Sequence, residues 1–454
     1  MAMSSRIVPA GRFERVGAHS HIKGLGVRNG KALPVADGMV GQVEARGAAA
    51  IVVDMVKRGK MAGRGILLVG PPGSGKTALA SAIAKELGED VPFIAISASE
   101  VYSTELKKSE FIMQALRKAI GVRIREVRRV YEGMVTELDI KMGKHPYNPY
   151  QQVPVGARIR LKTKLEEKAF NVDETVAAEL IARGVQVGDV IWIDAETGRV
   201  TRLGRCEEAL SEYKYDIEVS QKVPLPSGPI SSEKEFIHTV TLHQLDVSYA
   251  RSTSSSIFSL LFGGREEKEI PPEDRQRVDR MVKEWVDEGR AEIIPGVLFI
   301  DDVHMLDLEA FAYLGRAMES ELAPIIVLAT NRGMAKIRGT DVEAPHGVPL
   351  DLLDRLLIIK MKPYTEDEIR EILKVRAKEE NVELSDDALE VLTKIGAETS
   401  LRYAVQLLAP SLEIAKYQGR NVVTSDDVKR AHEMFIDVKR SVSYLRKYEE
   451  MFLK

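Results

Sequence analysis

The chain has 454 residues, 44% of them hydrophobic and 29% charged, and a formal net charge of −3. The length predicts about three domains, the composition excludes a disordered or fibrous protein, and the charge indicates no polyanionic partner for the chain as a whole. The single cysteine, Cys206, cannot form an intrachain disulfide, and no apolar run approaches the ~20 residues that span a bilayer. We therefore expect an intracellular protein without a membrane partner, cytoplasmic or, in a eukaryote, nuclear.

The first clear element is an apolar strand at 66–69, followed by a loop rich in glycine and proline and a helical pattern that ends at Gly88. The loop and the first helical residues are Gly70, Pro71, Pro72, Gly73, Ser74, Gly75, Lys76, Thr77 and Ala78. They fit the pattern G-x-x-x-x-G-K-[ST], in which backbone N–H groups surround phosphates, Lys76 neutralises the β- and γ-phosphates and the Thr77 hydroxyl binds Mg²⁺. A glycine-rich turn without a ligand is the alternative. The position between a strand and a helix favours ATP or ADP with Mg²⁺ as cofactors.

A different kind of sequence separates this first part from a later one. Residues 91–97 form a second apolar strand, after which the α/β pattern breaks at Gly121 and resumes near Glu292. Alternating apolar and polar residues predict antiparallel strands around 157–164, 189–204 and 236–245, with one helix at 173–184. The interval therefore predicts an inserted β-rich domain, similar to a small oligonucleotide-binding barrel.

The first part of this interval is basic, with eleven Lys or Arg against six Asp or Glu in residues 122–168. Between 157 and 164 four cations alternate with uncharged residues, so one face of the predicted strand is cationic: Arg158, Arg160, Lys162 and Lys164. Such a face suits the backbone of DNA or RNA. Basic residues that only keep an exposed strand soluble are the alternative.

Where the α/β pattern resumes, two strands end in polar residues. The segment GVLFIDD is an apolar strand that ends in Asp301 and Asp302, and the strand of APIIVLATN ends at Asn331. Beside a phosphate loop, the first acid is expected to hold Mg²⁺, the second to orient the attacking water, and the asparagine to contact the γ-phosphate or the water. The alternatives are two acids that begin a helix and a turn-forming asparagine. After Pro363 the pattern is wholly helical, with Ser, Thr or acidic capping residues, and predicts a helical lid.

Six segments carry a resemblance to a known family: HSHIKGLG, GPPGSGKTALA, LFIDDVHMLD, LATNRG, PLDLLDRLLII and TSLRYAVQLL. In this order, around an insert, they resemble the RuvB-like AAA+ ATPases, the Pontin and Reptin family. The resemblance implies an α/β fold: a P-loop AAA+ core with a parallel sheet, an inserted β-rich domain like an oligonucleotide-binding barrel, and a C-terminal helical lid. The core would comprise residues 1–121 and 292–363, the insert 122–291 and the lid 364–454.

The resemblance also implies roles for individual residues. Asn331 would be the first sensor, Arg355 the arginine finger that reaches the neighbouring subunit's γ-phosphate, and Arg402 the second sensor. An adenine pocket is implied at His19, His21, Met39, Val40 and Tyr364. For each arginine a surface ion pair is the alternative, with Asp351 or Asp354 as the partner of Arg355. A metal site at the two histidines is disfavoured, because the sequence offers no further ligand nearby.

The sequence departs from the family pattern at Asp302, where the family has glutamate. The shorter side chain holds its carboxylate about 1.5 Å further back. Because a misplacement of ~1 Å can cost ~10²-fold in rate, either hydrolysis is slow or the backbone is shifted to compensate.

The function implied by the resemblance is ATP hydrolysis in a ring, a homo-hexamer or a hexamer with a related subunit, single or stacked as a double ring. Hydrolysis would drive helicase-like or translocase-like processing of DNA, or the remodelling and assembly of protein–nucleic-acid complexes such as chromatin, with protein clients in large complexes. The alternative is a nucleotide-gated assembly scaffold with slow hydrolysis and no motor activity.

Overall fold

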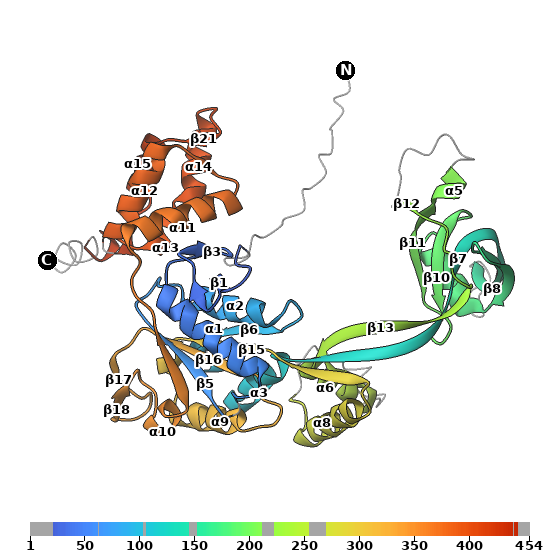
Figure 1. Cartoon of the computed structure of the whole chain (residues 1–454), viewed down its shortest axis with the longest axis horizontal. Coiled ribbons are helices and arrows are strands. Elements are labelled where there is room, and N and C mark those ends of the chain that lie inside the picture. Colours follow the sequence, from blue (N-terminus) through green and yellow to red (C-terminus); the bar gives the residue numbers. More distant parts are fainter. Residues whose placement is uncertain are drawn as a thin grey trace. The chain divides into compact units, whose positions relative to one another are not determined.

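The computed structural model describes residues 21–61, 63–102, 106–144, 152–210, 222–253, 269–438 and 440–443. The chain folds into two compact units (Figure 1). The first unit comprises Met1–Val122, Val240–Lys283 and Ile293–Lys454, and the second comprises Arg123–Thr239 and Glu284–Glu292. Within the described ranges, no helix combines the length and apolar character that would let it cross a membrane.

A five-stranded parallel sheet forms the centre of the first unit. In spatial order its strands are β19 (Leu356–Lys360), β5 (Gly65–Val69), β16 (Ile325–Thr330), β15 (Val297–Asp301) and β6 (Phe93–Ser97). Alternate residues of β5 and β15 enter two separate hydrophobic cores, because successive side chains of a strand point to opposite faces. Burial on both faces explains why these strands appear in the sequence as unbroken apolar runs.

Helices cover both faces of this sheet. Helices α1 (Val43–Lys57) and α2 (Lys76–Leu87) share one core with Ile66 and Leu68 of β5, and α3 (Lys108–Lys118) and α9 (Leu308–Met318) share the other with Leu67. The expected α/β fold with a parallel sheet is confirmed. The shorter elements of this part are β1 (Val27–Arg28), β2 (Lys31–Ala32), β3 (Val35–Ala36), β4 (Met39–Val40), η1 (Ala98–Tyr102), η2 (Val303–Met305), β17 (Met334–Lys336), β18 (Glu343–Pro345) and α10 (Leu350–Leu353).

The C-terminal part of the first unit is a helical lid around its own apolar core, as the sequence predicts. Its elements are α11 (Glu366–Glu379), β20 (Glu383–Leu384), α12 (Asp386–Glu398), α13 (Leu401–Gln406), α14 (Leu408–Tyr417), β21 (Val422–Val423) and α15 (Ser425–Met434). Side chains of Thr365, Ser385 and Ser400 accept hydrogen bonds from the first turns of α11, α12 and α13. At α15 the carboxylate of Asp427 is held by both terminal nitrogens of Arg420, at 2.8 Å each.

The second unit is a mixed sheet in the order β12-β11-β10-β7-β8-β9, with β13 and β14 also paired to β7. Its elements are β7 (Ile120–Lys144), β8 (Gln152–Lys162), β9 (Glu167–Val172), α4 (Glu174–Ala182), β10 (Asp189–Asp194), β11 (Val200–Cys206), α5 (Glu207–Leu210), β12 (Lys222–Val223), β13 (Ser231–Thr241) and β14 (Ala291–Pro295). The predicted β-rich insert with one helix after β9 is confirmed, and its closure into a barrel stays a prediction.

Two helices inside the predicted insert belong to the first unit: α6 (Leu242–Thr253) and most of α8 (Pro272–Asp287). The predicted strand at 236–245 is wrong in its last residues, because α6 begins at Leu242. Both helices are joined to α3 by buried ion pairs, Arg117 with Asp246 at 2.6 Å and Glu110 with Arg275 at 3.0 Å. These bonds explain why residues 240–283 belong to the first unit. The predicted domain boundaries stay a prediction.

Candidate nucleotide-binding site

Three neighbouring strands of the parallel sheet end in the polar residues that the sequence singled out. The phosphate-loop pattern follows β5, Asn331 follows β16, and Asp301 is the last residue of β15. In the sheet β16 lies between β5 and β15. Since the carboxyl ends of parallel strands meet at one edge, these residues share that edge, where ligands of α/β proteins bind.

The backbone of the loop needs its glycines. Gly73 and Gly75 have φ of 78° and 86°, the left-handed region that glycine enters without strain. At Gly70 an added Cβ would lie 2.8 Å from the Met361 carbonyl oxygen, so a larger residue would push the loop away from β19. The Lys76 ammonium donates to the Gly70 and Pro71 carbonyl oxygens at 3.0 and 2.9 Å, and its flexible stem lets it turn to an incoming anion.

The charges around the loop converge on Lys76. Burial lowers the pKa of this ammonium, the nearby Asp301 and Asp302 raise it, and Arg402 lowers it. Arg402 is the second residue of α13 in the lid, whereas in the core Asp301 ends β15 and Asp302 follows it. The core therefore brings two acids and Lys76 to this place, and the lid brings Arg402. Such a mixture of charges suits a metal-bound polyphosphate.

Asp302 has an unusual backbone. Its φ of 51° and ψ of 42° lie in the left-handed region, and its N–H donates to Asp301 Oδ1 at 2.9 Å. Aspartate tolerates this conformation better than longer side chains, because its short carboxylate can bond locally to the backbone. The conformation gives a physical reason for aspartate at this position.

A cavity of about 460 Å³ lies between the phosphate loop and the lid, in the size range of small-molecule sites. It collects most of the predicted site residues: His21, Met39, Val40, Pro72, Gly73, Gly75, Lys76, Thr77, Ala78, Asp301, Asp302, Asn331, Tyr364 and Arg402. Gly70, Pro71 and Ser74 shape the loop without lining the cavity, and His19 lies outside the described residues. The sequence did not indicate the further lining residues Ile22, Gly38, Ile372, Val375, Arg376, Leu401 and Val405.

One part of the cavity suits an uncharged, flat group. Burial raises the pKa of Tyr364 to about 12, so its phenol stays neutral. Burial and the charge of Arg376 lower the pKa of His21, which favours the neutral ring. With Met39 of β4 and Ile372 of α11, elements that pack together, these side chains form an apolar wall with few charges, as a nucleotide base requires.

Oxygen donors for Mg²⁺ are present at the polar part of the cavity. Thr77 is the second residue of α2 and Asp301 ends β15, and both line the cavity. Among the described residues no three His, Cys, Asp or Glu side chains are grouped as a metal site. A hydroxyl and a carboxylate are oxygen ligands of the kind that bind Mg²⁺ together with substrate phosphates and waters.

Arg355 lies away from its own cavity. It directly precedes β19, and its carbonyl oxygen accepts from the N–H of Gly65, the first residue of β5. Arg355 is therefore at the edge of the sheet where the strands begin. Because β5 has 5 residues, roughly 16 Å of strand separate Arg355 from the phosphate loop. Its guanidinium pairs with Glu319 after α9, and not with Asp351 or Asp354, and its side chain is 43% exposed.

The predicted cationic face of β8 is only partly as expected. Ile159, Leu161 and Thr163 are buried, and the cations between them point outward. However, three of the four cations of β8 and its following turn lie opposite an acid on a neighbouring strand. The pairs are Arg158 with Asp139, Arg160 with Glu137 and Lys162 with Glu167. Because directly opposed residues lie on one face of a sheet, this face carries mixed charge. The prediction of a cationic face holds for the strand alone and is wrong for the sheet.

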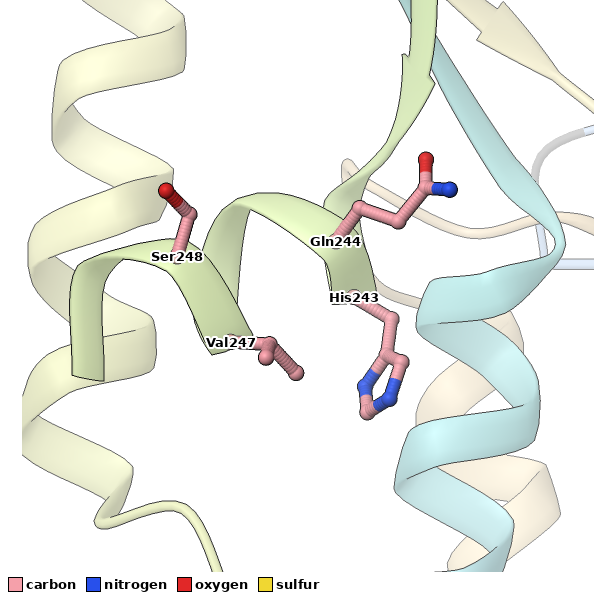
Figure 2. Close-up of a pocket in the computed structure, with 4 residues that line it drawn as sticks. All are labelled: His243, Gln244, Val247 and Ser248. Atoms are coloured by element: carbon pink, nitrogen blue, oxygen red, sulfur yellow. The ribbon is translucent and has the colours of Figure 1, made fainter. Parts of the chain in front are cut away.

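A second cavity, of about 340 Å³, lies along α6 and is lined by His243, Gln244, Val247 and Ser248 (Figure 2). All four side chains come from two turns of one helix. They include no acid, lysine or arginine, so this cavity lacks the convergent charges of the first.

The chain matches two family models, the TIP49 P-loop domain over residues 15–367 and the TIP49 AAA-lid domain over residues 372–437. It is 46% identical over 447 residues to the RuvB-like helicase 1 of Aedes aegypti and to that of Drosophila melanogaster, covering 97% of this chain and 98% of each relative. It is 45% identical over 459 residues to the RuvB-like helicase 1 of Mycosarcoma maydis, covering 98% of this chain and 93% of that relative. The chain therefore belongs to the RuvB-like AAA+ ATPases, the Pontin and Reptin family, and is a nucleotide-binding AAA+ ATPase.

Proposed function

We propose that this protein hydrolyses ATP with Mg²⁺ in a ring of six subunits, and that each active site is completed by the neighbouring subunit. One observation carries the proposal. The phosphate loop, Asp301, Asp302 and Asn331 meet at the carboxyl ends of three adjacent strands, and Arg402 of the lid faces them across one cavity.

Each residue has a task that follows from its chemistry. Lys76 leaves the loop carbonyls and neutralises the β- and γ-phosphate oxygens, and Thr77 and Asp301 supply oxygen ligands to Mg²⁺. Bound Mg²⁺ offsets the charge of the transferred phosphoryl group. Asp302 accepts a hydrogen bond from the attacking water and so fixes its direction, while Asn331 holds the water or the γ-phosphate.

The neighbouring subunit supplies the missing cation. Arg355 stands at the opposite edge of the sheet from its own phosphate loop, so it cannot serve its own nucleotide without unfolding β19. Its exposed side chain, held by a surface ion pair with Glu319, is free to exchange that partner for a phosphate at a subunit boundary. The ring is a homo-hexamer or a hexamer with a related subunit, and its nucleotide state is read by Arg402 in the lid.

We propose that hydrolysis drives DNA processing or the remodelling of protein–nucleic-acid complexes inside the cell, as the name helicase of the relatives suggests. Clients would be protein components of such complexes. A second function, a nucleotide-gated assembly scaffold, is favoured by the mixed charge of the β8 face. An acid stands opposite each of three cations there, which weakens attraction to a phosphate backbone.

One experiment separates the two functions. ATP turnover is measured with and without DNA, the mass of the assembly is determined in parallel, and Lys76→Ala serves as the inactive control. Turnover that DNA increases supports the motor. Turnover that DNA leaves unchanged, with partner binding that depends on nucleotide and survives Asp302→Asn, supports the scaffold. An absence of turnover above the Lys76→Ala level under all conditions contradicts ATP hydrolysis.

A further inference from the structure

Arg46 of α1 is a fully buried arginine, and it binds the segment that brings Ile22, Met39 and Val40 to the cavity. Its guanidinium donates to four backbone carbonyl oxygens: Leu25 at 2.7 Å, Leu33 at 2.6 Å, Gly41 at 3.0 Å and Gly26 at 3.1 Å. Burial lowers its pKa, but an arginine begins so high that it remains charged. A buried cation is costly unless it is hydrogen-bonded, so these four bonds are needed to keep it there.

The four carbonyls belong to residues 22–41, the segment that contributes Ile22, Met39 and Val40 to the lining of the cavity. Residues 22–41 contain only the paired two-residue strands β1–β2 and β3–β4, so the segment has little regular structure of its own. The guanidinium binds this segment near its start, in its middle and at its end. A planar group with five donors can bridge such separate carbonyls, whereas a lysine ammonium presents three donors from one atom.

The same segment brings three cavity-lining side chains to the nucleotide site. Ile22, Met39 and Val40 are 1%, 3% and 5% exposed, and all three line the cavity. Next to Gly41, the Gln42 side-chain amide donates to Lys362 O at 2.6 Å and accepts from Lys362 N at 3.2 Å, which ties the segment to the connection that leads into the lid.

We propose that Arg46 is a positioning residue for the base of the bound nucleotide: by holding four carbonyls at once, it gives residues 22–41 the shape of a base-binding wall. The proposal rests on the proposed nucleotide function. The four hydrogen bonds of Arg46 go to residues 25–41 and not to the phosphate loop, so we expect its effect on ligands that have a base.

The structure provides a second way to disturb this arrangement while Arg46 is kept. Gly26 is buried, has φ of 61°, and an added Cβ would collide with the Arg46 guanidinium and lie 2.7 Å from the Ala36 Cβ. Gly26→Ala should therefore displace the guanidinium from its carbonyls. Arg58→Met is the matched control, because Arg58 lies exposed at the end of the same helix.

The test compares two ligands, ADP and inorganic tripolyphosphate, by calorimetry on the full chain with Mg²⁺. For Arg46→Lys, Arg46→Met and Gly26→Ala we expect the Kd of ADP to rise about tenfold, the equivalent of losing about one charged hydrogen bond, and that of tripolyphosphate to stay unchanged. Hydrogen exchange should quicken in residues 22–41 and not in α2. Arg58→Met should match the parent in every measurement.

Three outcomes overturn the inference: unchanged ADP affinity in Arg46→Lys and Gly26→Ala, equal loss of both ligands, or equal loss of exchange protection throughout the first unit. Melting curves identify a variant that fails to fold. If Arg46→Met does not fold, the ADP and tripolyphosphate affinities of Arg46→Lys and Gly26→Ala test the inference. If the parent itself binds neither ligand, the proposed function fails. If the parent binds both and the variants behave like it, only the role of Arg46 fails.

Discussion

Replacing Asp302 should separate the orientation of water from the binding of ATP. Asp302→Asn keeps the size of the side chain and suits the left-handed backbone at φ 51° and ψ 42°, because asparagine also tolerates this region. It removes the negative charge that, as we propose, fixes the attacking water. We expect kcat to fall by ~10²–10⁴-fold, the usual contribution of a general base, with the KM for ATP within a factor of about two of the parent.

Asp302→Glu should have the opposite effect. The added methylene moves the carboxylate ~1.5 Å toward the water, and ~1 Å of placement is worth up to ~10² in rate, so kcat should rise between a few-fold and ~10²-fold. The longer side chain fits the left-handed backbone less well, at a cost of about 1 kcal/mol in stability. We therefore expect Asp302→Glu to have a slightly lower melting temperature and a faster turnover than the parent.

The assay is steady-state phosphate release at saturating ATP, with ATP affinity measured by calorimetry on the same preparations. Asp54→Glu is the matched control, since it lengthens an exposed acid on α1 that does not line the cavity. If Asp302→Asn turns over at the parent rate, Asp302 does not orient the water. If Asp302→Glu is slower than the parent at normal ATP affinity, the backbone has already compensated for the shorter side chain.

Three further predictions concern the insert, the lid and the α3 ion pairs. Reversing Arg160 and Lys162 to Glu should change the log–log salt slope of DNA binding by less than one unit, because each cation already faces an acid; a decrease near ~1.8 would show two direct phosphate contacts. The pKa of Asp427 is lowered to about 2, chiefly by its ion pair, so the stability it contributes is complete above pH ~4 and lost as the pH falls toward 2. Asp427→Asn should remove that pH dependence from lid unfolding followed by near-UV circular dichroism, and an unchanged acid transition would contradict the assignment. Asp246→Asn should destabilise the packing of α6 on α3 by ~3–5 kcal/mol, because the Asp246 side chain is 0% exposed. Asp279→Asn should destabilise the packing of α8 by no more than ~1 kcal/mol, because the Asp279 side chain is 37% exposed. Hydrogen exchange of α6 and α8 measures both effects, and equal losses of protection would contradict the prediction.

The phosphate-loop side of the cavity could be predicted because its signals are local. A phosphate loop, a strand that ends in Asp301 and a strand followed by Asn331 are each complete within about ten residues, and the rules of parallel sheets then bring their ends together. The apolar residues that the lid adds to the cavity gave no comparable signal. Ile372 and Val375 have the spacing of any helical face that packs on a core, so the sequence alone could not show that they line a cavity.

The errors came from pairings between distant segments. The acids opposite β8 depend on strand register, so Glu137 and Glu167 could not be assigned to Arg160 and Lys162 from the sequence. The partner of Arg355 is Glu319, 36 residues away, and not a neighbour along the chain. The connection between α6 and α3 likewise depends on a buried ion pair that joins segments 129 residues apart.

The most direct test of an active site shared between subunits is ATP turnover by mixed rings. Arg355→Ala subunits keep an intact nucleotide site and lack the finger, whereas Lys76→Ala subunits keep the finger and lack the site, so each variant alone should be inactive. With random 1:1 mixing, half of the subunits have an intact site and half of those have an intact neighbouring finger, which predicts about 25% of parent turnover. No recovery at any ratio, with subunit exchange confirmed by mass determination, or full activity of Arg355→Ala alone, would contradict a shared active site.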